Sequence, residues 1–80
     1  MKLAKLIWTT RRKEVFLASV ILTRKELDVF DAIIMGDTYE EIAEARGWSV
    51  KKVNTIADDI KAKYRVAQAE NPDVLEPLPK

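Results

Sequence analysis

The sequence contains no cysteine and no histidine, and only two of its 80 residues are glycine. A disulfide framework is therefore excluded, and so is a zinc site of the usual Cys/His type. The longest apolar run, Val15 to Leu22, contains Ser19 and is far too short to span a bilayer. The small-residue cleavage site expected after a signal peptide is also missing. We therefore expect a cytoplasmic protein without a membrane segment.

The residue types that most enzyme sites require are missing as well. The sequence offers no cysteine or histidine for nucleophilic or acid–base chemistry, and no glycine-rich phosphate loop. A chain of 80 residues is also too short to place a pair of carboxylates in a sizeable cavity. We therefore expect neither catalysis nor a bound metal or cofactor.

The charge is balanced overall but segregated along the chain. Apolar residues make up 48% and charged residues 34%, as in one folded domain with a modest core. The net charge is +1, but residues 1–25 carry +6, residues 26–47 carry −6, residues 48–65 carry +3 and residues 66–80 carry −2. A basic face that binds DNA is thus compatible with a sum near zero.

Three helix starts are marked by capping residues. Thr23 with Glu26, and Thr38 with Glu41, have the spacing of a capping box, in which each side chain satisfies a backbone N–H of the other residue. Ser49 can cap a third helix. The predicted helices are Thr23–Met35, Thr38–Arg46 and Ser49–Ala69.

The helix ends and the apolar spacing agree with these starts. Gly36 and Gly47 each follow a predicted helix, where a left-handed residue often ends it. Only Gly47 and Trp48 separate the second helix from the cap of the third, a link typical of a helix-turn-helix. Trp48 is predicted to form a hydrophobic staple with Val53. The residues predicted to be buried are Leu27, Phe30, Ile33, Ile34, Ile42, Ala43, Val53, Ile56, Ala57, Ile60 and Tyr64.

The stretch LTRKELDVFDAIIMGDTYEEIAEARGWSVKKVNTIADDIKAKYRV follows, with departures, the pattern LTxRExEVL, GxSNKEIA and GxSxxTVKxHxxxIxxKLxV. The matching residues, in register and without a gap, are Leu22, Thr23, Glu26, Val29, Gly36, Glu41, Ile42, Ala43, Gly47, Ser49, Val53, Thr55, Ile60, Lys63 and Val66. Residues 22–66 thus resemble the DNA-binding domain of LuxR/GerE-type response regulators, and region four of sigma factors has nearly the same signature. The resemblance implies an all-α fold with a three-helix helix-turn-helix domain over residues 22–69 that binds double-stranded DNA.

The departures from the family pattern weaken the case for DNA. The family usually has leucine at Arg46, lysine at Asn54, histidine at Ile56 and a basic or polar residue at Ala57. Two typical contacts to the DNA backbone are therefore missing. The family's fourth helix, which often forms dimers, corresponds here to AQAENPDVLEPLPK. Its three prolines forbid a regular helix, so residues 70–80 are predicted to be an irregular tail.

The predicted third helix is the candidate element for reading bases. With Val53 at the centre of its buried face, Lys51, Thr55 and Asp58 lie on the opposite face. The candidates for base contacts are Lys51, Lys52, Asn54, Thr55 and Asp58. The candidates for phosphate contacts are Arg24, Lys25, Thr38, Tyr39, Arg46, Ser49 and Lys61.

Each candidate also has a simpler interpretation. Lys51 and Lys52 can be ordinary solvated lysines, and Asp58 can pair with Lys61 one helical turn away. In the same way Asp59 is predicted to pair with Lys63. These aspartates and the acidic middle segment favour a second hypothesis. A helix-turn-helix scaffold can dock on RNA polymerase, a sigma factor or another regulator instead of DNA.

The N-terminal extension, residues 1–21, lies outside the resemblance. Apolar spacing favours a helix over residues 11–20, with Thr10 as a candidate cap, although a buried strand or a hairpin also fits the sequence. Its apolar surface exceeds what a small three-helix core needs. We therefore expect it to pack on the domain or to form a homodimer. Residues 11–13 can also serve as a basic arm on DNA, or as a solvated face.

Overall fold

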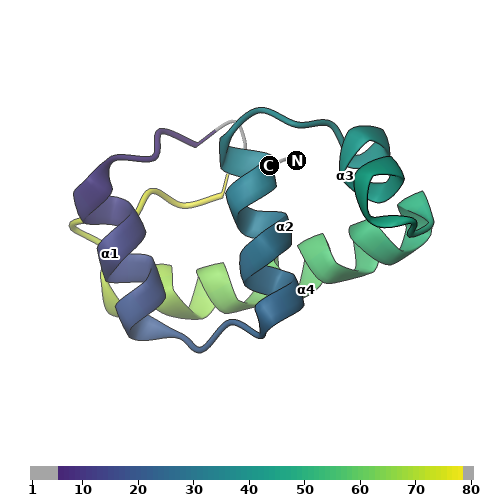
Figure 1. Ribbon diagram of the computed structural model, residues 1–80. Helices are drawn as coiled ribbons and strands as arrows, with labels where there is room; N and C mark the ends of the chain where they lie inside the picture. The colour runs from purple at the N-terminus through teal and green to yellow at the C-terminus, as the bar shows by residue number, and fades with distance from the viewer. Residues whose placement is uncertain (1–5, 79–80) are drawn as a thin grey trace.

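The computed structural model describes residues 6–78, which form four α-helices and no strand. The helices are α1 (Thr10–Ser19), α2 (Arg24–Ile34), α3 (Tyr39–Arg46) and α4 (Val50–Glu70) (Figure 1). The predicted all-α class is confirmed. The prediction of a helix over residues 11–20 is also confirmed, and the alternatives of a strand or a hairpin are wrong.

The predicted capping boxes are present at α2 and α3. Thr23 Oγ1 accepts a hydrogen bond from the Glu26 backbone N–H at 3.2 Å, while Glu26 Oε1 accepts one from the Thr23 N–H at 2.8 Å. Thr38 and Glu41 repeat this exchange at 3.1 and 2.9 Å. At α1 the prediction is wrong by one residue. Thr9, not Thr10, is the cap, because Thr9 has an extended backbone and its hydroxyl accepts the Arg12 N–H.

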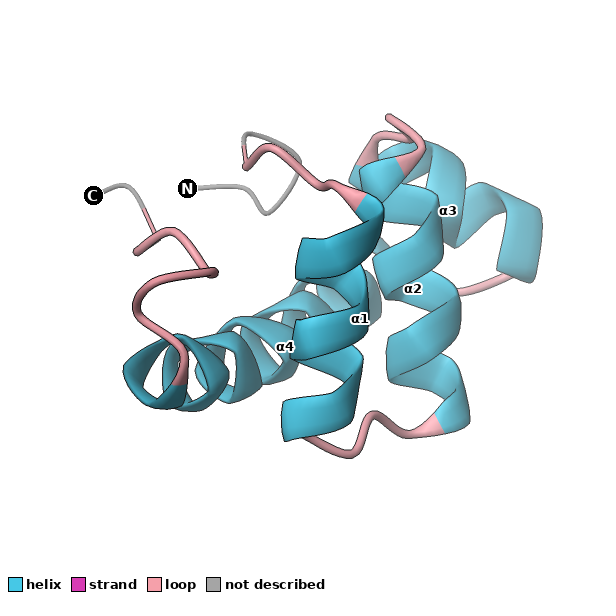
Figure 2. Cartoon of the chain, turned by 90° about the vertical axis from the view of Figure 1, so that its left-hand side faces the viewer, coloured by secondary structure: helices cyan, strands magenta, loops and turns pink. Residues whose placement is uncertain are grey.

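α4 is the long element that the other helices contact. It has 21 residues, and α3 packs beside its N-terminal part, α2 crosses its middle and α1 lies beside its C-terminal part (Figure 1). Figure 2, viewed from the α1 side, shows the tail turning back from the end of α4. One hydrophobic core runs along α4, with Val53, Ala57 and Ile60 fully buried.

An aromatic cluster fills the core at the α1 end. Phe16 and Phe30 are fully buried and their ring centroids lie 5.2 Å apart. Trp8 packs edge-on against Phe30 at 4.9 Å, and Tyr64 lies 5.4 Å from Phe16. The described part of the extension, residues 6–21, therefore packs on the domain, which is one of the two roles expected for it, and residues 1–5 lie outside the described residues.

The tail is irregular, as predicted, but it is packed. α4 ends at Glu70, and the described part of the tail has no helix although Leu75 is 1% exposed. The Tyr64 hydroxyl donates to the Glu76 carbonyl at 2.5 Å, and the Glu76 carboxylate pairs with Arg12. The last of the three prolines lies outside the described residues.

α2 differs from the prediction in which residues it buries. Leu27 is 39% exposed, and Ile34 is only partly buried. Val29 and Glu26 are buried instead. The predicted stripe was rotated: the buried face of α2 packs on α4, and the Phe30 ring on this face also contacts Phe16 of α1.

The buried carboxylate of Glu26 is held by Lys63. Lys63 Nζ donates to Glu26 Oε1 at 2.6 Å and to the Ile21 carbonyl at 2.7 Å. The predicted pair of Lys63 with Asp59 is therefore wrong. Burial opposes ionisation of Glu26, but the hydrogen bonds from Lys63 and from the Thr23 backbone outweigh it and lower the pKa of this carboxyl.

Candidate nucleic-acid interface

The link between α3 and α4 is as short as the sequence predicted. Gly47 adopts the left-handed conformation, with φ of 69°, and the Trp48 backbone N–H donates a hydrogen bond to the Ala43 carbonyl at 2.9 Å. The Ser49 hydroxyl then caps α4 by accepting the Lys52 N–H at 3.1 Å. This tight connection fixes the direction in which the first turns of α4 leave α3.

The first half of α4 presents a row of exposed polar side chains. Lys51, Asn54, Thr55 and Asp58 are all exposed, while Val53 is fully buried. The Thr55 hydroxyl donates to the Lys51 carbonyl at 3.1 Å, so its methyl group is the part that faces away from the helix backbone. Four of the five base-contact candidates thus share one accessible face, as the helical spacing predicted.

The fifth candidate, Lys52, lies beside this row. Its ammonium sits 4.6 Å from the centroid of the Trp48 ring, within the range of a cation–π interaction. Trp48 itself is half-buried and packs against the core that contains Val53, and its direct contact with Val53 stays a prediction. The Trp48 ring therefore restrains the Lys52 ammonium near the first turn of α4.

Asp58 carries a weak ion pair with Lys61, as predicted. The two groups are 3.7 Å apart, and the Asp58 side chain is 75% exposed whereas that of Lys61 is 17% exposed. An exposed helix pair of this kind contributes only a few tenths of a kcal/mol. Asp58 therefore still presents its carboxylate to any molecule that approaches α4.

Arg46 has a strong partner inside the protein. Its Nε and Nη2 donate to the two carboxylate oxygens of Asp28 at 2.5 and 2.6 Å, and its side chain is 22% exposed. The hydrogen bonding by Arg46 lowers the pKa of Asp28. In a bidentate pair of this kind the carboxylate balances the positive charge of the guanidinium and occupies its N–H donors. Arg46 is therefore poorly placed to bind a phosphate.

The three candidates at helix N-termini are also engaged in the fold. The hydroxyls of Thr38 and Ser49 serve as caps. The Tyr39 hydroxyl is buried without a hydrogen-bond partner among the described residues. Burial, followed by the negative charge of Asp58, raises the pKa of Tyr39. This phenol reaches a phosphate only if its side chain rotates.

Arg24 and Lys25 are exposed but lie away from the α3–α4 turn. They begin α2, next to Glu26, which is bound to Lys63 in the second half of α4. Lys63 is 12 residues beyond Lys51, which corresponds to about 18 Å along an α-helix. The structure therefore separates these two cations from the row on the first half of α4.

Two features of this region were not foreseen. The contact of Lys52 with Trp48 joins residues four apart on the chain, a spacing at which helix-terminal side chains meet, so the sequence contained a signal for it. The pair of Arg46 with Asp28 spans 18 residues and depends on how α3 packs against α2. No local pattern indicates it.

Among residues 6–78 there is no helix long and apolar enough to cross a membrane, and no group of acidic side chains that could hold a metal ion. Comparison of the chain with protein-family models, with curated proteins and with solved structures returned no match.

Proposed function

We propose that the protein binds double-stranded DNA by inserting the first half of α4 into the major groove. The observation that carries this proposal is the exposed row of Lys51, Asn54 and Thr55 on the face of α4 opposite its core. The first half of α4 follows the tight turn at Gly47 and the cap at Ser49 and lies beside α3 at one end of the molecule (Figure 1). A helix that follows such a turn has the dimensions that the major groove admits.

The side chains in the row match base edges. Lys51 can donate to guanine O6 and N7, and Asn54 can form a bidentate pair with adenine. The Thr55 methyl can contact the methyl group of thymine, and Asp58 can accept from cytosine N4. Because its members recognise different bases, this row suits a sequence-specific site and a role as a small transcriptional regulator.

The phosphate contacts of this DNA-binding mode are few. Arg46 is neutralised by Asp28, and Lys61 lies next to Asp58. Lys51 and Lys52 are left as the cations nearest the groove, with backbone N–H groups at the start of α4 to assist them. We therefore expect a low affinity for non-specific DNA and a shallow dependence on salt, because counterion release scales with the phosphates neutralised.

The test is fluorescence anisotropy of a mixed-sequence duplex titrated with the full chain at low and at moderate salt. Lys51→Glu reverses the charge at the N-terminal end of the row without removing a packed side chain. We expect this variant to lose at least about tenfold in affinity, because one phosphate or base contact becomes a repulsion. Site selection on random DNA then gives the target sequence.

Arg11→Glu is the matched control, with the same change of charge on an exposed residue of α1. It also tests the basic-arm interpretation of residues 11–13. Equal losses in the two variants would show that binding depends on net charge or on the basic arm as much as on α4. If the unmodified protein does not bind at low salt, the proposal is wrong.

A second function is favoured by the acidic groups around the row. Asp58 and Asp59 are exposed on α4, and Glu40 and Glu44 are exposed on α3. Such an acidic surface is complementary in charge to a basic patch on a protein of the transcription machinery and can bind it. Replacing Asp58 and Asp59 by asparagine separates the two functions. The double variant binds DNA more tightly if α4 faces DNA, and it leaves the DNA affinity near zero if α4 docks on a protein.

A further inference from the structure

Arg65, in the second half of α4, is a cation without a partner in the described part of the chain. It is exposed, and its guanidinium has no hydrogen bond or ion pair with any of residues 6–78. Four positions before it lies Lys61, at the spacing at which helix side chains are neighbours, and like charges at that spacing disfavour a helix. The charge of Arg65 is therefore not used to stabilise α4 and is available to a ligand.

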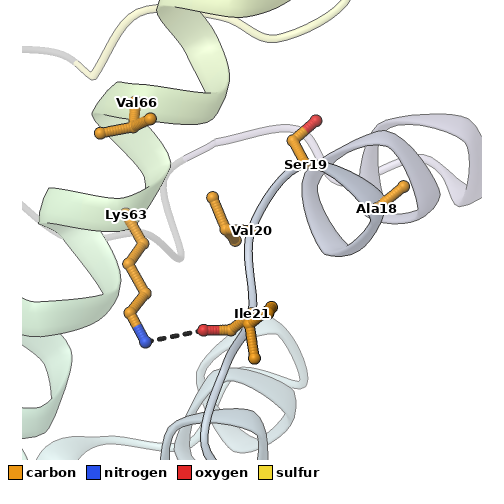
Figure 3. Close-up of a pocket in the computed structure, with 6 residues that line it drawn as sticks. All are labelled: Ala18, Ser19, Val20, Ile21, Lys63 and Val66. Atoms are coloured by element: carbon orange, nitrogen blue, oxygen red, sulfur yellow. Dashed lines mark hydrogen bonds between the residues drawn. The ribbon is translucent and has the colours of Figure 1, made fainter.

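The other two cations in this half of α4 are held by the protein. Lys61 forms the ion pair described above, one helical turn along α4. Lys63 donates to Glu26 at 2.6 Å and to the Ile21 carbonyl at 2.7 Å. Figure 3 shows this second bond, which crosses the open groove between α4 and the link from α1 to α2. In this half of the helix only Arg65 has its charge uncommitted.

Arg65 lies on the same side of α4 as the row of base-contact candidates. At 100° per residue, Lys51 lies about 160° around the helix from the buried Val53. Asp58 and Arg65 follow further along α4 at about 140° and about 120°. Between these two, Ala62 is exposed and carries only a methyl group. A molecule that meets the row can therefore follow α4 as far as Arg65.

We propose that Arg65 binds the phosphate backbone of DNA beside the bases that the row reads. This inference rests on the proposed function and names the part of the DNA that the second half of α4 meets. When a recognition helix lies in the major groove, its N-terminal residues contact base edges, and its C-terminal end can contact the backbone. A guanidinium suits this second role, because its planar set of N–H donors matches the oxygens of a phosphate.

The distance along α4 suits this contact. Arg65 is 10 residues beyond Thr55, near the centre of the row, which corresponds to about 15 Å. Side chains on a helix lean towards its N-terminus, so an extended arginine places its guanidinium about 10 Å from that centre. The major groove is about 12 Å wide, and its phosphate walls therefore lie about 6 Å from its middle. A helix that crosses the groove obliquely thus brings the Arg65 guanidinium past the base edges to one wall.

Two cations then hold α4 at both ends of the segment that reads bases. Lys52 is restrained against Trp48 in the first turn, and Arg65 lies 13 residues further along, about 20 Å away. Phosphate contacts carry no sequence information but fix the orientation of a protein on the duplex. The angle of α4 across the groove is consequently set by Lys52 and Arg65, and the choice of bases by the row between them.

The test is the DNA affinity of the full chain as a function of salt, measured by fluorescence anisotropy on two duplexes of unrelated mixed sequence. Arg65→Gln removes the charge and keeps a good helix former. Loss of one phosphate contact should lower the affinity about tenfold near 50 mM salt and about threefold near 200 mM, and should reduce the slope of log K against log salt by about 0.9. Both duplexes should show the same loss.

Arg24→Gln is the matched control. Arg24 is also exposed, but it begins α2, which packs on the buried face of α4, opposite the row. It should leave the affinity and the slope unchanged. Arg65→Lys keeps the charge and should keep the slope, which a purely structural role of the arginine does not predict. Because both positions are exposed, circular dichroism should show the same helix content in all three variants.

The outcomes separate this inference from the proposed function. An unchanged slope in Arg65→Gln, equal changes in Arg65→Gln and Arg24→Gln, or an equal loss in Arg65→Lys would overturn the role of Arg65. If Lys51→Glu still loses affinity in that case, the proposed function stands and DNA meets only the first half of α4. A reduced slope in Arg65→Gln together with an unaffected Lys51→Glu would keep the phosphate contact and reject insertion of the row. Failure of the unmodified protein to bind at low salt would end both.

Discussion

The two ends of α4 are stabilised in different ways. At the C-terminal end, four aromatic rings from α1, α2, α4 and the segment before α1 pack together, and the tail adds the buried Leu75 to the core. At the N-terminal end, the buried residues are the aliphatic Ile42, Ala43 and Val53, and the rings of Tyr39 and Trp48 are only partly buried against the core. Capping residues and one left-handed glycine shape the chain at that end.

This difference separates stability from recognition. Each large ring buries more apolar area than an aliphatic side chain, so we expect the C-terminal end to contribute the larger part of the free energy of folding. The N-terminal end keeps its polar row accessible because little packs over it. Substitutions at the C-terminal end of α4 should therefore lower the free energy of unfolding, and substitutions at its N-terminal end should mainly lower the binding affinity. Three predictions test this division, in order of decreasing effect.

Phe16→Ala should have the largest effect. Phe16 is fully buried at the centre of the aromatic cluster, and truncation of a buried phenylalanine costs about 3–5 kcal/mol. That is a large part of the total stability of a domain of this size. Urea unfolding followed by circular dichroism measures the loss, with Arg11→Ala on the exposed side of α1 as control. A cost below about 1 kcal/mol would contradict the division between the two ends.

Lys63→Met should cost less, about 2 kcal/mol near neutral pH, because Glu26 stays buried with one hydrogen-bond donor removed. The pKa of Glu26 is lowered in the folded protein, so its contribution is present above the ordinary pKa of a glutamate and is lost as the pH falls through the lowered value. Without Lys63 that loss should begin at a higher pH.

Urea midpoints at about pH 7 and about pH 3 measure this dependence. Lys13→Met is the matched control, since it removes an exposed pair with Asp31 at 3.4 Å and should cost less than about 0.5 kcal/mol. If both lysine variants lose the same stability at both pH values, the buried carboxylate is not held by Lys63.

Gly47→Ala should have the smallest effect on stability. Gly47 has φ of 69°, and no atom lies within 4 Å of an added Cβ, so only backbone strain of about 1–2 kcal/mol opposes the alanine. Because this turn sets the direction of α4, DNA affinity should fall by more than the stability loss accounts for. An unchanged affinity would mean that the turn does not position the row.

The sequence predicted the parts of the fold that depend on local signals. Thr23, Thr38 and Ser49 fixed three helix starts because a cap acts within one turn of the chain. The burial of Leu75 and the pairs Arg12–Glu76 and Lys63–Glu26 were not predicted, since they join residues 37 to 64 positions apart. Such contacts depend on how the helices pack, for which a single sequence contains no short pattern.

The candidate site was predicted unevenly for the same reason. Exposure of Lys51, Asn54 and Thr55 follows from the helical period once Val53 is taken as buried. The neutralisation of Arg46 by Asp28 depends on the angle between α2 and α3, and so does the position of Arg24 far from the turn. The row of base-contact candidates was accessible to sequence reasoning, whereas the distribution of phosphate-contact candidates was not.

The positions of the two tryptophans make each end of α4 optically distinct. Trp8 lies among the aromatic rings at one end, and Trp48 lies beneath the Lys52 ammonium at the other. The sequence has no third tryptophan, so replacing either one with phenylalanine leaves a single emitter. Emission from Trp8 would then follow melting of the core, while emission from Trp48 would follow occupation of the surface beside it, without any attached dye.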